Sequence, residues 1–218
     1  MFRIRTYNQI ALRGLERFPR DRFEVASELS EPDALLLRSH PLGGADIPPT
    51  VKAVARAGAG VNNIDVAHCS ARGIPVFNTP GANANAVKEL VVAGLLLASR
   101  HLREGLDWVA GLRADSEADL HRQVEEGKKH FQGRELRGRT LGVVGLGAIG
   151  SRVAHTALSL DMNVIGYDPA LSVDAAWRLP SQVAPMASLE ALLARADYVT
   201  LHLPVSYTHL RAHETRHD

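Results

Sequence analysis

The sequence has little cysteine, few aromatic residues and no long hydrophobic run. Its 218 residues include a single cysteine, Cys69, and only 5% are aromatic. One cysteine excludes an internal disulfide and is typical of a reducing compartment. The longest apolar run, residues 90–99, is about half as long as a membrane span, and the first residues carry no stretch suited to a signal peptide. We therefore expect a soluble, cytoplasmic, globular protein.

An excess of either charge is also missing. Lys and Arg number 25 against 24 Asp and Glu, which gives a net charge of +1. This balance argues against nucleic acid or a membrane surface as a partner held by bulk electrostatics, and leaves a small molecule. Apolar residues make up 45% of the chain, enough for a sizeable core, and the length allows two modest domains.

Short apolar strands alternate with helical patterns along the chain, which predicts an α/β fold with parallel sheets covered on both faces. The stretch NTPGANA (residues 78–84) interrupts the first series, and a long helix, or two helices, follows from about Asn85. We expect a first domain over residues 1–81 and a second over residues 82–205. The expected strands cover residues 2–7, 34–39, 51–58, 75–78, 140–145, 163–168 and 198–203, with helices over residues 149–160 and 188–196. Trp108 and Trp177 are expected to pack in the interior.

GLGAIG, residues 145–150, stands between an apolar strand and a helical pattern. In a dinucleotide-binding turn, Gly145 permits the tight turn, Gly147 lets the backbone approach a diphosphate, and Gly150 lets the helix pack on the strand. Asp168 ends the next expected strand, 18 residues after Gly150 (168 − 150). An acid there accepts from a ribose hydroxyl and repels a 2′-phosphate, which favours NAD over NADP. The alternative is a glycine-rich turn of another α/β fold, with Asp168 simply solvated.

Three stretches of the chain together resemble the D-2-hydroxyacid dehydrogenase family. They are ARAGAGVNNIDVAHCSARGIPVFNTPGANANAVKELVVAGLLLASR (55–100), GKKHFQGRELRGRTLGVVGLGAIG (127–150) and GYDP (166–169). The resemblance implies a flavodoxin-like substrate domain, an inserted Rossmann domain, and an active site in the cleft between them. It also implies a homodimer in the full-length protein, formed by the helix that opens the inserted domain. Packing of that helix within one subunit is the alternative.

The resemblance also implies roles for individual residues. Arg38 would pair with the anionic group of the substrate, since a guanidinium binds phosphate or carboxylate with two parallel hydrogen bonds. The simpler interpretation is a surface arginine at a strand end, beside ordinary loop glycines and asparagines. The substrate-side residues are Arg38, Ser39, Gly60, Val61 and Asn83. The NAD-side residues are Ala59, Val87, Gly145, Gly147, Ala148, Ile149, Gly150, Asp168, His202, Leu203 and Pro204.

Within the family, the resemblance favours oxidation of 3-phosphoglycerate by NAD to 3-phosphohydroxypyruvate, the first step of serine biosynthesis. Two alternatives remain: a related dehydrogenase of glycerate, lactate or another 2-hydroxy acid, and a non-catalytic NAD-binding protein like the corepressors of the family. No metal is implied.

The last residues depart from the family pattern. After LHLP the chain continues with Val205 and SYTHLRAHETRHD, whereas the family's catalytic arginine, glutamate and histidine come later in the sequence. We therefore expect a truncated Rossmann domain, an incomplete substrate domain, no catalytic residue, and a non-native tail over residues 206–218. His209, His213 and His217 in this tail are spaced like metal ligands, but no cysteine or carboxylate accompanies that spacing.

The first prediction concerns turnover. Hydride transfer to a 2-keto acid needs a cation to polarise the carbonyl and an acid to protonate the alkoxide. Because we expect the residues that supply them to be absent, we expect the 218-residue chain to be inactive. Because we expect both domains to be incomplete, we also expect the chain to be marginally stable. An NADH-linked assay of the purified chain with phosphohydroxypyruvate measures this. Turnover above background would contradict it.

Overall fold

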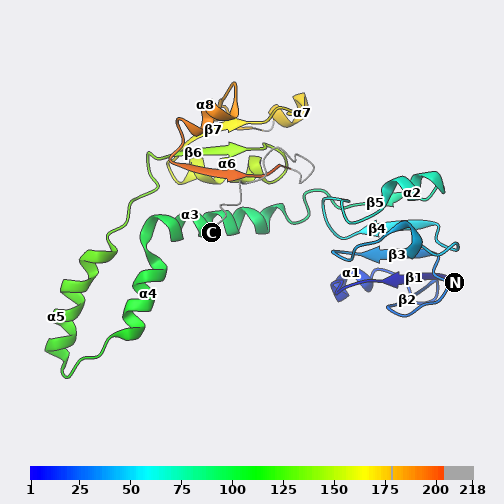
Figure 1. Cartoon of the computed structure of the whole chain (residues 1–218), viewed down its shortest axis with the longest axis horizontal. Helices are drawn as coiled ribbons and strands as arrows, with labels where there is room; N and C mark the ends of the chain where they lie inside the picture. Colours follow the sequence, from blue (N-terminus) through cyan, green and yellow to red (C-terminus); the bar gives the residue numbers. More distant parts are fainter. Residues whose placement is uncertain (178, 204–218) are drawn as a thin grey trace, which may run out of the picture. The chain divides into compact units, whose positions relative to one another are not determined.

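The computed structural model describes residues 1–177 and 179–203 (Figure 1). Within this range the chain forms two compact units, Met1–Asn83 and Ala84–Leu203. The expected division after residue 81 and this division after Asn83 lie in the same NTPGANA stretch. Each unit has its own sheet and its own core.

The first unit contains a five-stranded sheet in the order β2-β1-β3-β4-β5, with every pair parallel. This is the 2-1-3-4-5 order of flavodoxin-like folds, as expected for the substrate domain. The strands are β1 Phe2–Thr6, β2 Phe23–Ala26, β3 Ala34–Leu37, β4 Ala53–Arg56 and β5 Val76–Phe77.

Two features of this first sheet differ from expectation. Strand β2 was not expected, because FEVA is short and carries the charged Glu24. The helical cover is also thinner than the apolar strands predict: among the described residues it consists of α1 Leu12–Leu15, the 3-10 turn η1 Gly44–Asp46 and α2 Val66–Ala71. Leu35, Leu37 and Val54 are fully buried with Cys69 of α2, whereas the alternating positions of β3 are only half-buried.

The second unit contains a four-stranded parallel sheet in the order β8-β7-β6-β9. Counted from β6, this is the 3-2-1-4 order with which a Rossmann fold begins. The strands are β6 Thr140–Val144, β7 Asn163–Tyr167, β8 Ala184–Pro185 and β9 Tyr198–Leu201; the helices between them are α6 Gly150–Ser159, α7 Val173–Ala176 and α8 Leu189–Leu193. Both expected helices and all three expected strands are present.

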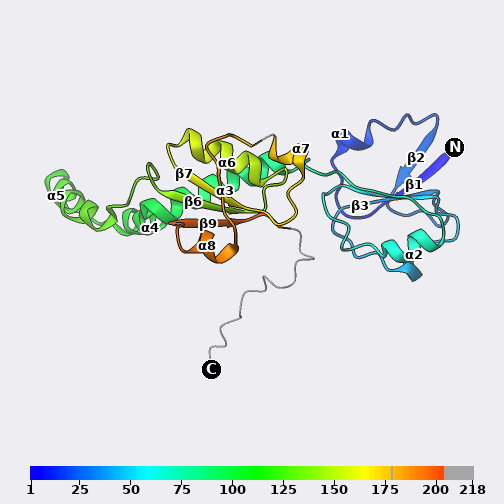
Figure 2. The same ribbon diagram turned by 90° about the horizontal axis from the view of Figure 1, so that it is seen from above.

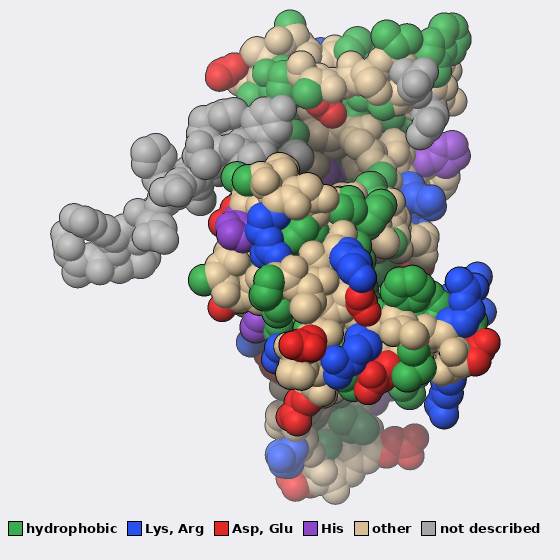
Figure 3. Space-filling view, turned by 90° about the vertical axis from the view of Figure 1, so that its right-hand side faces the viewer, with side chains coloured by type: hydrophobic (Ala, Val, Ile, Leu, Met, Phe, Trp, Pro, Cys, Tyr) green, Lys and Arg blue, Asp and Glu red, His purple; other side chains and the backbone are tan. Residues whose placement is uncertain are grey.

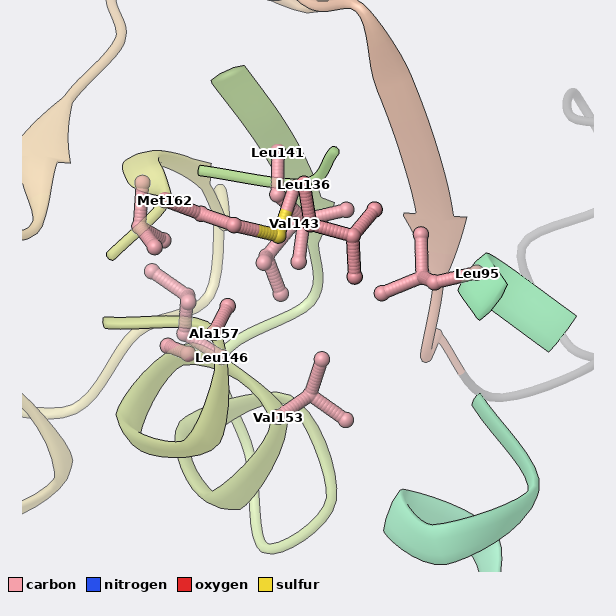
Figure 4. Packing of buried hydrophobic residues seen from close by; sticks show 10 residues of the cluster. Leu95, Leu136, Leu141, Val143, Leu146, Val153, Ala157 and Met162 are labelled. Carbon is pink, nitrogen blue, oxygen red and sulfur yellow. The ribbon is translucent and has the colours of Figure 1, made fainter. Parts of the chain in front are cut away.

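Side-chain alternation along β6 builds two cores on the two faces of this sheet. Leu141 and Val143 pack with Val153 of α6 and with Leu95 of α3 Ala84–Arg100 (Figure 4). The next residue, Val144, faces the other way and packs with Leu192 of α8. Helices α6 and α8 accordingly lie on opposite sides of the strands (Figure 2). The sheet is therefore covered on both faces, as the apolar strands predict.

A helical excursion connects α3 to β6. The expected long helix divides into α3 and α4 Leu102–Gly111, because His101 takes a left-handed conformation with φ 48°. Then come α5 Glu117–Gly127 and the 3-10 turn η2 Lys128–Phe131. Trp108 packs on Phe131 with the ring centroids 5.4 Å apart, as expected for an interior residue. The same expectation is wrong for Trp177, which is 84% exposed.

The described surface carries both charges. On the face shown in Figure 3, acidic and basic side chains are intermixed, with hydrophobic side chains among them. Within the described residues, no helix combines the length and the hydropathy that crossing a membrane requires.

Candidate functional site

The Gly-rich turn lies where β6 ends, and its first glycine is fixed by backbone contacts. Gly145 has φ 88°, a backbone conformation that residues other than glycine rarely adopt. Its N–H donates to the carbonyl of Tyr167 at 2.9 Å. A Cβ on Gly145 would lie 2.8 Å from the backbone carbonyl of His202, so the turn passes directly beside the end of β9.

The other two glycines have opposite surroundings. A Cβ on Gly150 would overlap the carbonyl oxygen of Gly145, because the first turn of α6 packs directly on the end of β6. Gly147 is exposed, and a Cβ there would have nothing within 4 Å. The backbone is therefore closed on the protein side and open on the solvent side, which is the arrangement a close-approaching phosphate needs.

Free amide groups face this open side. Within the described part of the chain, the N–H groups of Gly147, Ala148, Ile149 and Gly150 donate to no protein acceptor, and the first amide of α6 with one is Ser151, bonded to the Gly147 carbonyl at 3.0 Å. Unpaired amides at a helix N-terminus, together with the positive end of the helix dipole, attract an anion. The structure thus fits a diphosphate at the predicted residues.

Asp168 lies immediately after β7, and two backbone amides fix its carboxylate. Leu146 N–H donates to Oδ2 at 2.8 Å and Ala170 N–H donates to Oδ1 at 2.9 Å. A carboxylate accepts about four hydrogen bonds, so acceptor sites remain for the hydroxyls of a ribose. The bond from Leu146 also places the acid beside the Gly-rich turn.

The end of β9 forms the neighbouring wall. His202 N–H donates to the Val144 carbonyl at 2.7 Å, which extends the ladder between β6 and β9. The ring Nε2 of His202 lies 2.9 Å from Thr200 Oγ1, and burial lowers the pKa of His202. The side chain of Leu203 comes within 3.0 Å of a Cβ placed on Gly145. The expected residue Pro204 lies outside the described residues.

The substrate-side residues follow the strands of the first unit. Arg38 and Ser39 come directly after β3 and are exposed. The side chain of Asn8 holds this loop: its Oδ1 accepts from Ser39 N–H at 3.0 Å and from His40 N–H at 2.8 Å. The guanidinium of Arg38 is therefore presented from a fixed backbone.

Arg56, at the end of β4, contacts two of the predicted substrate-side residues, and the sequence reasoning did not single it out. Its guanidinium donates from Nε to the Arg38 carbonyl at 2.9 Å and from Nη1 to the Gly60 carbonyl. A Cβ on Gly60 would lie 3.1 Å from Nη1 of the same guanidinium, a tight contact, and a Cβ on Gly58 would lie at ordinary contact distance from it. Arg56 thus joins the loop after β3 to the Gly58–Val61 turn. A charged residue in the apolar VKAVARAG stretch was the available signal.

The remaining predicted residues surround these loops. Ala59 is exposed, and its carbonyl accepts from Asn78 Nδ2 at 2.6 Å, while the Val61 carbonyl accepts from Ile64 N–H at 3.0 Å. Asn83 is exposed at the end of the first unit, and Val87 is half-buried in the first turn of α3. The substrate side therefore lies in one unit and the Gly-rich turn in the other. A shared cleft stays a prediction.

Metal and thiol chemistry find little support in this part of the chain. The described residues contain no group of three His, Cys, Asp or Glu side chains placed to hold a metal ion. Cys69 is buried, and that burial raises the pKa of its thiol, as for a packing residue. His209, His213 and His217 lie outside the described residues.

Sequence comparison assigns the family. Residues 92–213 match the model of the D-isomer specific 2-hydroxyacid dehydrogenase NAD-binding domain. This chain belongs to that dehydrogenase family. The matched range contains the Gly-rich turn and Asp168, so the cofactor of the second unit is NAD. It also extends past residue 205, and the non-native tail therefore stays a prediction.

Individual relatives agree with the family. The D-3-phosphoglycerate dehydrogenase of Mycobacterium leprae is 37% identical over 187 residues, which are 84% of this chain and 33% of that protein. The hydroxypyruvate reductase of Thermotoga maritima is 36% identical over 191 residues, 84% of this chain and 55% of that protein. The chain thus spans about a third to a half of these relatives.

Solved structures share the fold. The D-lactate dehydrogenase of Aquifex aeolicus, complexed with NAD and lactic acid, superposes with a TM-score of 0.69 at 24% identity. The superposition covers 93% of this chain and 60% of that one.

The two glycines provide a matched pair of substitutions. Gly147→Ala places a methyl group in open space on the solvent side, so we expect unchanged thermal unfolding but NADH binding weakened by about tenfold or more. Gly150→Ala places its methyl group against the Gly145 carbonyl, so we expect a lower unfolding temperature as well. Calorimetric titration with NADH and thermal unfolding measure the two effects. Equal NADH affinity in Gly147→Ala and the unchanged chain would refute this site.

Proposed function

We propose that the full-length dehydrogenase oxidises 3-phosphoglycerate with NAD to 3-phosphohydroxypyruvate, the first step of serine biosynthesis, in the cytoplasm. The observation that carries the proposal is the open Gly-rich turn with its unpaired amides beside Asp168. Similarity to the D-3-phosphoglycerate dehydrogenase of Mycobacterium leprae supports the choice of substrate.

Different residues of the second unit bind different parts of NAD. The amides of Gly147, Ala148 and Ile149 bind the diphosphate, and Gly150 keeps α6 close enough to aim them. Asp168 accepts from the hydroxyls of the adenosine ribose. Val87, His202, Leu203 and Pro204, together with Ala59 of the first unit, line the nicotinamide side. When bound, NAD would supply the acceptor for the hydride that leaves the 2-carbon of the substrate.

The residues of the first unit bind the substrate. Arg38 and Ser39 bind its phosphate, because the guanidinium fork matches two phosphate oxygens and the serine hydroxyl donates to a third. Backbone amides of Gly60 and Val61 bind the carboxylate, and Asn83 adds a side-chain amide. Arg56 acts as a positioning residue, since it bonds to the carbonyls of both Arg38 and Gly60.

A second candidate is a related dehydrogenase of an unphosphorylated 2-hydroxy acid. The similarity to the hydroxypyruvate reductase of Thermotoga maritima, nearly as high as that to the phosphoglycerate enzyme, favours this alternative. The two differ in whether the substrate carries a phosphate, and therefore in what Arg38 contacts.

We also propose that the protein forms a homodimer through α3 and α4. The exposed large apolar side chains on these two helices support this proposal, because such a surface is costly to leave in water. They are Leu90, Leu96, Leu97, Leu102, Leu106 and Val109.

The cofactor preference depends on the charge of Asp168. Asp168→Asn keeps an acceptor for a backbone amide but removes the repulsion of a 2′-phosphate. We expect the ratio of NADH to NADPH affinity to fall by about tenfold or more. Titration of the variant with both cofactors measures the ratio, and Asp161→Asn, at an exposed acid on the same unit, is the control. An unchanged ratio would show that Asp168 does not face the ribose.

Substrate identity is testable by binding. With NADH bound, we expect the chain to bind 3-phosphoglycerate at least about tenfold more tightly than D-glycerate, because a charged phosphate gains strong hydrogen bonds from Arg38. Arg38→Gln should remove most of this difference, whereas Arg17→Gln, at an exposed arginine of the same unit, should not. Equal affinity for the two acids would favour the second candidate and leave the NAD site intact.

A further inference from the structure

A polar pocket of about 450 Å³ lies at the amino ends of β6 and β9, at the end of the second sheet opposite the Gly-rich turn. Arg139 precedes β6, and Asp197 and Tyr198 stand at the start of β9. Asp197 N–H donates to the Thr140 carbonyl at 2.9 Å, which joins the two amino ends. Since the Gly-rich turn follows the carboxyl end of β6, this pocket is separate from the NAD site.

Two segments distant in sequence build the pocket wall. Arg134 N–H donates to the Ser99 carbonyl at 2.7 Å, so the segment before β6 lies against the last turn of α3. The contact is close enough that a side chain on Gly133 would overlap the Ser99 backbone. The backbone bond to Ser99 therefore fixes the loop that carries Arg134, and this contact does not use the Arg134 guanidinium.

A buried hydroxyl pair fixes the hydrogen-bonding character of Tyr198. Ser99, only 4% exposed, donates from Oγ to the Leu95 carbonyl at 2.6 Å and lies 2.8 Å from Tyr198 Oη. Because a hydroxyl carries a single hydrogen, Tyr198 must donate its own hydrogen to Ser99. Tyr198 is one of the residues that line the pocket, and its phenolic oxygen then has only lone pairs to offer a further partner.

The charges of the pocket leave one cation in excess. Arg139 Nη1 lies 3.4 Å from Asp197 Oδ1, while Asp197 Oδ2 accepts from Thr140 N–H at 2.8 Å. Arg134 makes no ion pair with any acid among the described residues. The residues that line the pocket thus include two arginines, whose guanidinium groups can donate, and Tyr198 and Asp197, whose oxygens can accept.

We propose that this pocket binds hydrogen phosphate. Its bare oxygens would accept from Arg134 and Arg139, since guanidinium groups match the geometry of phosphate. Its P–OH hydrogen would be donated to Tyr198 Oη or to the Asp197 carboxylate. Sulfate has the same shape but carries no hydrogen at neutral pH, so the same two acceptors repel it. The pocket is thus a phosphate site that discriminates against sulfate and needs no NAD.

The test is calorimetric titration of the full chain with phosphate and with sulfate at equal ionic strength, with NADH present to occupy the Gly-rich turn. We expect phosphate to bind at least about tenfold more tightly than sulfate. Arg134→Gln should weaken phosphate binding by about tenfold. Arg137→Gln, which removes an exposed arginine of the same segment, should leave binding unchanged. Tyr198→Phe should reduce the preference for phosphate, with thermal unfolding as the check on its fold.

Three results would overturn the proposal. Equal affinities for phosphate and sulfate would show that no acceptor faces the anion. Equal losses in Arg134→Gln and Arg137→Gln would show that only net charge matters. Absence of phosphate binding while NADH is bound would show that the pocket does not bind phosphate.

Discussion

The close packing of α6 on the end of β6 is the contact on which the NAD site depends. Gly150 lies against the carbonyl of Gly145, with no room for a side chain between them. This contact fixes the direction of the helix and the position of its first amides. Because those amides have no protein acceptors among the described residues, they remain available to an anion. Stability and ligand binding thus share the same few backbone groups.

The two faces of the second sheet serve this contact in different ways. On one face, Val143 and Val153 join α6 to the strand, and Leu95 brings α3 against both. On the other face, Leu192 fills the space over Gly142, where a side chain on the glycine would overlap it. The alternation of side chains along β6 therefore holds the turn from both sides. Either packing failure would move the amides that face the diphosphate.

Much of this architecture follows from the sequence because the signals are local. An apolar strand, three glycines at fixed spacing and an acid at the end of the next strand predict the turn and its partner Asp168. Strand β2 and the break at His101 could not be predicted in this way. FEVA becomes a strand because it pairs with β1, and His101 takes its left-handed conformation where α3 gives way to α4. Trp177 shows the converse, since this large apolar residue is exposed and none of the described elements buries it.

The sequence by itself determined the family, the cofactor and the position of the Gly-rich turn, because such a turn is defined by neighbours within a few residues. Only the tertiary structure decided which groups hold these residues in place. Arg56 binds the carbonyls of Arg38 and Gly60, and Tyr198 meets Ser99 across 99 positions of sequence. Such contacts join segments that lie far apart in the sequence, so no local pattern predicts them. They exist only once the parallel strands have brought their ends together.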